Sequence, residues 1–99
     1  MAKYVLSPKA EKHLQSIWDF IAADNQNAAD RIVNELFAAF DRLAEWPGIG
    51  HTRSDLTQGD VRFWPVRSYL VVYREKPLPL QIVAILHGAR DIPSVLRSD

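Results

Sequence analysis

Five side chains in the second half of the chain have the chemistry to act on a phosphodiester or to bind a partner through charge: Arg62, Arg67, Arg74, His87 and Arg90. Cleavage of RNA by its own 2′-hydroxyl requires a general base, a general acid and cations around the scissile phosphate. Histidine titrates near neutrality and can serve as acid or base, while arginines hold phosphate through paired hydrogen bonds. If neighbouring antiparallel strands bring the five residues to one end or face of a sheet, they form a candidate catalytic or target-binding cluster.

The same five residues also have a structural interpretation. Arginines at strand ends commonly pair with carboxylates, and Glu75, Asp60 and Asp91 are available in this half of the chain. His87 and Gly88 can likewise form the turn by which the chain leaves a strand. The residues alone leave both interpretations open.

Other reaction chemistries find little support in the sequence. The chain has no cysteine, which excludes disulfides and thiolate sites. His13, His51 and His87 are not spaced as metal ligands. No serine has the context of a nucleophile, and the glycines of 48–50 lack the lysine of a phosphate-binding loop. We therefore expect no metal and no cofactor.

Length and composition predict one folded domain over residues 1–99. Hydrophobic residues make up 47% and charged residues 24%, as in ordinary globular proteins. Twelve basic side chains balance twelve acidic ones, which argues against direct, sequence-specific binding of nucleic acid, because such proteins carry a basic excess. No apolar run reaches the roughly 20 residues that span a bilayer, and the start does not look like a signal peptide. We expect a cytoplasmic protein that does not contact membranes.

The first half of the chain predicts a short strand over residues 3–6, followed by two helices. Ser7 and Pro8 suit the cap and the first position of the first helix, which should end near residues 24–25. Asn27 is the expected cap of the second helix, and the Pro-Gly pair at 47–48 ends it. Because the connection is short, the two amphipathic helices should form an antiparallel hairpin.

The second half predicts three strands, over residues 61–67, 69–74 and 80–86, each rich in β-branched and aromatic residues. Their short connections imply antiparallel pairing. A last short helix is expected over residues 92–96. This order of elements indicates an α+β fold, in which the helical hairpin packs on one face of a mostly antiparallel four-stranded sheet.

One helical hairpin covers only one face of such a sheet. Apolar residues alternate onto both faces of the last two strands, so we expect an exposed apolar face on which another polypeptide packs. The alternative is that the last helix and side-chain stems cover it. Pro65 places its own strand at a sheet edge, where a partner strand could add. The candidate partner-binding residues are Trp64, Leu70, Val72, Val83 and Ile85, with the last two expected on the same face.

Several segments taken in order carry a family resemblance: Leu6-Ser7-Pro8, Trp46-Pro47-Gly48-Ile49-Gly50, the three strand segments, and His87-Gly88-Ala89-Arg90-Asp91 after them. Together they resemble the ParE toxins of the RelE/ParE superfamily, over nearly the whole chain. The resemblance implies the toxin of a type II toxin–antitoxin system, held by a cognate antitoxin that wraps the sheet and helices. ParE toxins inhibit DNA gyrase, whereas RelE toxins cleave mRNA on the ribosome.

Three departures from the RelE pattern favour the gyrase-inhibiting branch. RelE-type nucleases tend to carry an arginine after the tyrosine that opens the third strand, a lysine-rich second strand and a tyrosine near the C-terminus. This chain has Leu70 after Tyr69, one arginine and no lysine in 61–63, and no tyrosine in 96–99. Cleavage would lack most of its charge stabilisation, so the resemblance implies a gyrase inhibitor that is not an enzyme. The alternatives are a ribosome-dependent mRNA endoribonuclease using His87 and the arginines, or an inactive relic that still binds antitoxin.

Overall fold

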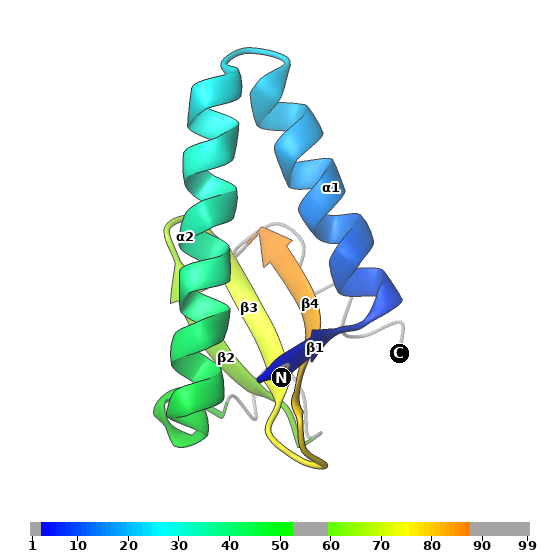
Figure 1. Ribbon diagram of the computed structural model, residues 1–99, viewed down its shortest axis with the longest axis vertical. Helices are drawn as coiled ribbons and strands as arrows, with labels where there is room; N and C mark the ends of the chain where they lie inside the picture. Colours follow the sequence, from blue (N-terminus) through cyan, green and yellow to red (C-terminus); the bar gives the residue numbers. More distant parts are fainter. Residues whose placement is uncertain (1–2, 53–59, 88–99) are drawn as a thin grey trace.

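The computed structural model describes residues 3–52 and 60–87. A helical hairpin lies on one face of a four-stranded sheet, and the two helices meet at a short loop at the far end of the hairpin (Figure 1). This arrangement confirms the predicted α+β class. The elements in chain order are β1 (Tyr4–Leu6), α1 (Pro8–Ala22), α2 (Gln26–Glu45), the 3₁₀ turn η1 (Pro47–Ile49), β2 (Arg62–Val66), β3 (Tyr69–Arg74) and β4 (Leu80–His87).

The start of α1 is as predicted. The Ser7 hydroxyl accepts a hydrogen bond from the Ala10 N–H at 3.0 Å, and Pro8 occupies the first turn. The expected cap of α2 was wrong, because Asn25 and not Asn27 accepts the first-turn N–H, that of Ala28, at 3.0 Å. The Asn25 N–H bonds back to a carbonyl of α1 at 2.8 Å, so the chain turns within three residues and the earlier asparagine reaches the cap position first.

The strand order in the sheet is β1-β4-β3-β2. β1 runs parallel to β4, and the other two pairs are antiparallel, as the short connections predicted. β3 has the predicted bounds, whereas β2 is shorter than expected at each end. The helix predicted over residues 92–96 lies outside the described residues.

The core between hairpin and sheet confirms the predicted alternation on β3 but not on β4. Val71 and Tyr73 of β3 pack with the helices, while Val72 packs on the other face. The register between β3 and β4 shifts after Val72, so β4 carries an extra residue there. Ile82 and Ile85 therefore both face the helices. The expectation that Ile85 lies on the same face as Val83 is wrong, because Val83 packs on the other face.

The second face of the sheet has a core of its own, and the expectation of a broadly exposed apolar face is wrong. Its central side chains are at most 8% exposed within the single chain: Val61, Phe63, Val72, Ala84 and Leu86. Leu70 and Val83 pack against this cluster and remain half-buried.

Where β1 stops, the side chains of Ser7 and of α1 take over hydrogen bonding to the edge of β4. β1 pairs with β4 only as far as Ile82. Beyond that point the Ser7 hydroxyl donates to the Val83 carbonyl at 2.7 Å, and the Ile85 N–H donates to His13 Nδ1 at 3.1 Å. Two polar groups of the strand edge are thereby satisfied, and α1 is held against β4. None of the described helices is both long and apolar enough to cross a bilayer.

Candidate functional site

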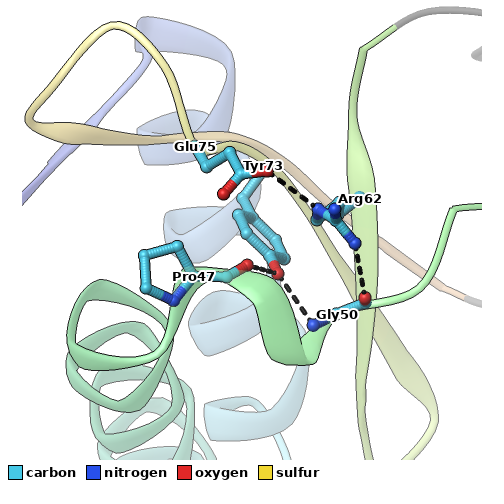
Figure 2. A network of polar contacts seen from close by, with 5 residues as sticks. All are labelled: Pro47, Gly50, Arg62, Tyr73 and Glu75. Carbon is cyan, nitrogen blue, oxygen red and sulfur yellow. Dashed lines mark hydrogen bonds and ion pairs between the residues drawn. The ribbon is translucent and has the colours of Figure 1, made fainter.

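A buried tyrosine ties the end of the helical hairpin to the sheet (Figure 2). The Tyr73 hydroxyl donates to the Pro47 carbonyl at 2.5 Å and accepts from the Gly50 N–H at 2.9 Å. The side chain is fully buried, and burial is the main cause that raises the pKa of its phenol. Nothing in the sequence linked the Pro-Gly turn to this strand, because the contact spans 26 residues.

Arg62, the first predicted site residue, belongs to the same network. Its Nε donates to Glu75 at 3.1 Å and its Nη1 donates to the Gly50 carbonyl at 3.1 Å (Figure 2). Two bonds in different directions fix the guanidinium plane at the start of β2. Arg62 therefore braces the loop after η1, and its side chain is 30% exposed.

Arg74 lies at the same end of the sheet as Arg62 but on the other face, because Arg62 pairs with Tyr73, the residue before Arg74. Its Nε donates to Asp60 at 2.9 Å, and this bond lowers the pKa of the Asp60 carboxyl. The structural interpretation, in which Glu75 and Asp60 pair with the strand arginines, is confirmed for these two pairs.

Arg67 lies at the opposite end of the sheet, in the tight turn between β2 and β3. Its backbone adopts φ 54°, and its Nε and Nη2 donate to the two oxygens of Glu35 on α2 at 2.6 and 2.8 Å. The hydrogen bond from Arg67 lowers the pKa of the Glu35 carboxyl and raises that of the guanidinium. The pair joins the β2–β3 turn to the middle of α2.

The Glu35–Arg67 pair predicts a weak stabilisation that disappears in acid. Because the pKa of Glu35 in the folded state lies below its ordinary 4.5, the pair contributes fully above pH 4.5 and is lost as the pH falls through the folded value. Glu35→Gln should therefore be less stable than the parent at pH 7 and indistinguishable from it in strong acid. Urea unfolding at both pH values measures this; a difference that persists in acid would contradict it.

His87 lies at the same end of the sheet as Arg67, because it pairs with Tyr69, two residues after that arginine. The rings of Tyr69 and His87 meet edge to face, with centroids 5.9 Å apart. Both residues line a cleft of about 470 Å³ between α1 and the end of the β3–β4 pair, with His13, Ser16, Ile17, Phe20, Ser68 and Ile85. The sequence did not indicate this cleft, since its walls come from segments far apart in the chain.

The predicted cluster is thus divided between the two ends of the sheet. Arg62 and Arg74 lie at one end and Arg67 and His87 at the other, and Arg90 lies outside the described residues. Each described arginine of the set is bound to a carboxylate. Within the described part of the chain, the histidine and these cations do not converge around one position that a scissile phosphate could occupy.

Trp64 lies on an edge strand, as Pro65 predicted. Its indole packs towards the helix-side core and stacks with the His51 ring at a centroid distance of 6.5 Å. The outer edge of β2 is already engaged, because Phe63 exchanges both backbone hydrogen bonds with His51. The next residue of β2 whose backbone groups point to this outer edge is Pro65, which has no N–H to donate. This edge offers little to an added partner strand.

The five candidate partner-binding residues fall on both faces of the sheet. Leu70, Val72 and Val83 belong to the face away from the hairpin, and Val72 is fully buried there. Trp64 and Ile85 belong to the helix-side core. Leu70 and Val83 are the members that combine accessibility with a place on the second face.

The fold defines a class: a helical hairpin on a β1-β4-β3-β2 sheet is the architecture expected of the RelE/ParE superfamily. Residues 4–92 match the family described as the ParE toxin of the type II toxin–antitoxin system, parDE. Toxin ParE1 from two strains of Mycobacterium tuberculosis is 31% identical over 93 residues, covering 92% of this chain and 94% of the relative. The chain belongs to the ParE toxin family.

A solved structure supports the same fold. One chain of the chromosomal ParDE TA system from P. aeruginosa superposes with a TM-score of 0.71 at 20% identity. The match covers 85% of this chain and 92% of that one, so the two chains share the fold over most of their lengths.

Proposed function

We propose that this chain is a toxin that inhibits DNA gyrase in the cytoplasm and that a cognate antitoxin neutralises it. The observation that carries the proposal is the match of residues 4–92 to the ParE toxin family. ParE toxins act on gyrase, which the resemblance in the sequence already implied.

The geometry supports action by binding and not by catalysis. RNA cleavage needs an acid, a base and cations at one phosphate. Here His87 and Arg62 lie at opposite ends of the sheet, and Leu70 occupies the place where nucleases of the superfamily carry an arginine.

An antitoxin partner is supported by the relatives, two of which are named toxin ParE1, and by the solved ParDE system. We propose that the antitoxin contacts the accessible part of the second sheet face, around Leu70 and Val83. Both side chains are half-buried and lie against an apolar cluster, so a covering chain would bury more apolar surface.

Supercoiling by purified gyrase, with and without this protein, tests the proposal. The expected result is loss of supercoiling together with accumulation of linear plasmid, reversed when the antitoxin is added. Heat-unfolded protein is the control for non-specific effects. A folded protein that leaves gyrase unaffected but cleaves mRNA on ribosomes would overturn the proposal in favour of a ribosome-dependent endoribonuclease. Inactivity in both assays would leave an inert relic.

Among Arg62, Arg67 and Arg74, Arg67 has the most exposed side chain, at 55%, and it is our first candidate for contact with gyrase. Arg67→Ala should raise the concentration needed for half inhibition about tenfold, as expected for loss of one charge-assisted contact. Glu35→Gln is the matched control, because it breaks the same ion pair and leaves the cation. Equal losses in both variants would show that the pair acts through structure and not through contact.

A further inference from the structure

The imidazole ring of His13 holds α1 against the edge of β4. The Ile85 N–H donates to its Nδ1 at 3.1 Å, beyond the point at which β1 ceases to pair with β4. Ile85 is 3% exposed, so its N–H is largely removed from water and depends on the ring for a hydrogen bond. The contact joins residues that are 72 positions apart in the chain.

The direction of this hydrogen bond fixes the protonation state of the ring. A backbone N–H is always the donor, so the Nδ1 that faces it accepts, and in the neutral imidazole the proton lies on Nε2. In the protonated imidazole both nitrogens carry protons, and Nδ1–H would face the Ile85 N–H. Protonation of His13 and its hydrogen bond to Ile85 therefore exclude each other.

The charged and titratable groups around His13 come from α1 and from the sheet. The charged residues of α1 that are nearest in sequence are two lysines and a glutamate: Lys9, Glu11 and Lys12. The glutamate lies on the other flank of the helix, where it lines a groove with side chains of α2. On the sheet, Tyr69 and His87 line the same cleft as His13, and no described residue of that lining is a carboxylate. The positive charge of the lysines opposes a further cation on α1.

A second polar contact between the start of α1 and β4 does not titrate near neutrality. The Ser7 hydroxyl donates to the Val83 carbonyl at 2.7 Å. In addition, Ile17 and Ile85 belong to the same apolar core cluster. Loss of the His13 bond would therefore leave α1 attached at its start and through its apolar face. It would release the flank of α1 that forms one wall of the cleft of about 470 Å³.

We propose that His13 is an acid-sensitive switch. The neutral ring closes α1 on β4, and the protonated ring lets α1 move away and opens the cleft between them. An opened ring binds the proton that the closed arrangement excludes. The bond therefore contributes fully above the ordinary titration range of histidine, near pH 6.5, and its contribution is lost as the pH falls through that range.

Hydrogen exchange of the Ile85 amide in the ¹⁵N-labelled full chain tests this switch. An opened ring that titrates near pH 6.5 is protonated about ten to one at pH 5.5. After correction for intrinsic exchange, the protection factor of Ile85 should therefore fall about tenfold more than those of the other β4 amides between pH 7.5 and pH 5.5. The ring ¹⁵N shifts of His13 at pH 7.5 should show an unprotonated Nδ1 and a protonated Nε2.

Two variants assign the effect to one ring. His13→Asn places an acceptor oxygen near the position of Nδ1 and does not titrate, so the additional fall in Ile85 protection should disappear. His87→Asn is the matched control, because it removes the other histidine of the cleft and should leave the fall unchanged.

A His13 ring that becomes protonated while the Ile85 amide keeps its protection and its chemical shift would overturn the proposal. So would a fall in protection that survives His13→Asn or disappears in His87→Asn. The ring shifts are measured on the parent chain, so the proposal can be refuted even if His13→Asn does not fold. None of these measurements involves gyrase or antitoxin, so their outcome is independent of the proposed toxin activity.

Discussion

Replacing Gly50 by alanine is expected to lower the free energy of unfolding by about 3 kcal/mol, through overpacking and loss of buried hydrogen bonds. A Cβ at this position would lie 2.2 Å from the Tyr73 hydroxyl oxygen and 2.6 Å from its Cε1. The ring is fully buried and its hydroxyl makes two hydrogen bonds, so moving it away from the new Cβ would disturb its packing and break those bonds. Urea unfolding measures the loss.

Gly48→Ala is the matched control, because a Cβ there meets no described atom within 4 Å. Gly48 lies in η1 and Gly50 is the residue that follows η1, so loss of glycine flexibility in the unfolded chain is comparable in both variants. Tyr73→Phe combined with Gly50→Ala should cost less than the sum of the single changes, since both break the same contacts. A loss below about 1 kcal/mol for Gly50→Ala would show that the Tyr73 ring can shift to accommodate the added Cβ.

Phe40→Ala is expected to cost about 3–5 kcal/mol, the range for removing a large buried aromatic side chain. Phe40 is fully buried where α2 meets the sheet. Its ring meets Tyr4 of β1 edge to face at 5.5 Å and Phe37 at 5.6 Å. Removal therefore leaves a cavity between the helix and the edge strand and loses two aromatic contacts.

The comparison for Phe40 is Phe20→Ala, which removes the same side chain from a position that is 81% exposed and should change stability by less than about 0.5 kcal/mol. The denaturant slope should stay constant in both variants, because the surface exposed on unfolding changes little. Similar losses for the two phenylalanines would contradict the placement of the core.

These stability effects bear on how toxicity is interpreted. A chain of this length is stable by only about 5–15 kcal/mol, so a loss of about 3–5 kcal/mol removes a large share of its stability. Loss of gyrase inhibition in Gly50 or Phe40 variants would then report on folding. Substitutions at Arg67, whose side chain is 55% exposed, leave the core intact and therefore report on contacts.

Local patterns were sufficient for the elements and the class. Ser7 and Pro8 mark the start of α1 because a cap and a first-turn proline act within one turn of helix. The bounds of β3 followed from a run of apolar residues between a turn and a charge. The strand arginines were also correctly associated with Glu75 and Asp60 as one of two interpretations.

What the sequence by itself determined is therefore the hairpin, the sheet, the pairing of neighbouring strands and the family, since each depends on short-range periodicity or on the order of segments. The tertiary structure alone decided the bulge that moves Ile85 to the helix side and the separation of Arg62 from His87. It also decided the hydrogen bonds by which Tyr73 holds the turn at residues 47–50. It also decided that Val72 is buried within the chain. These features depend on contacts between residues far apart in sequence, whose geometry is set only when helices and sheet pack together.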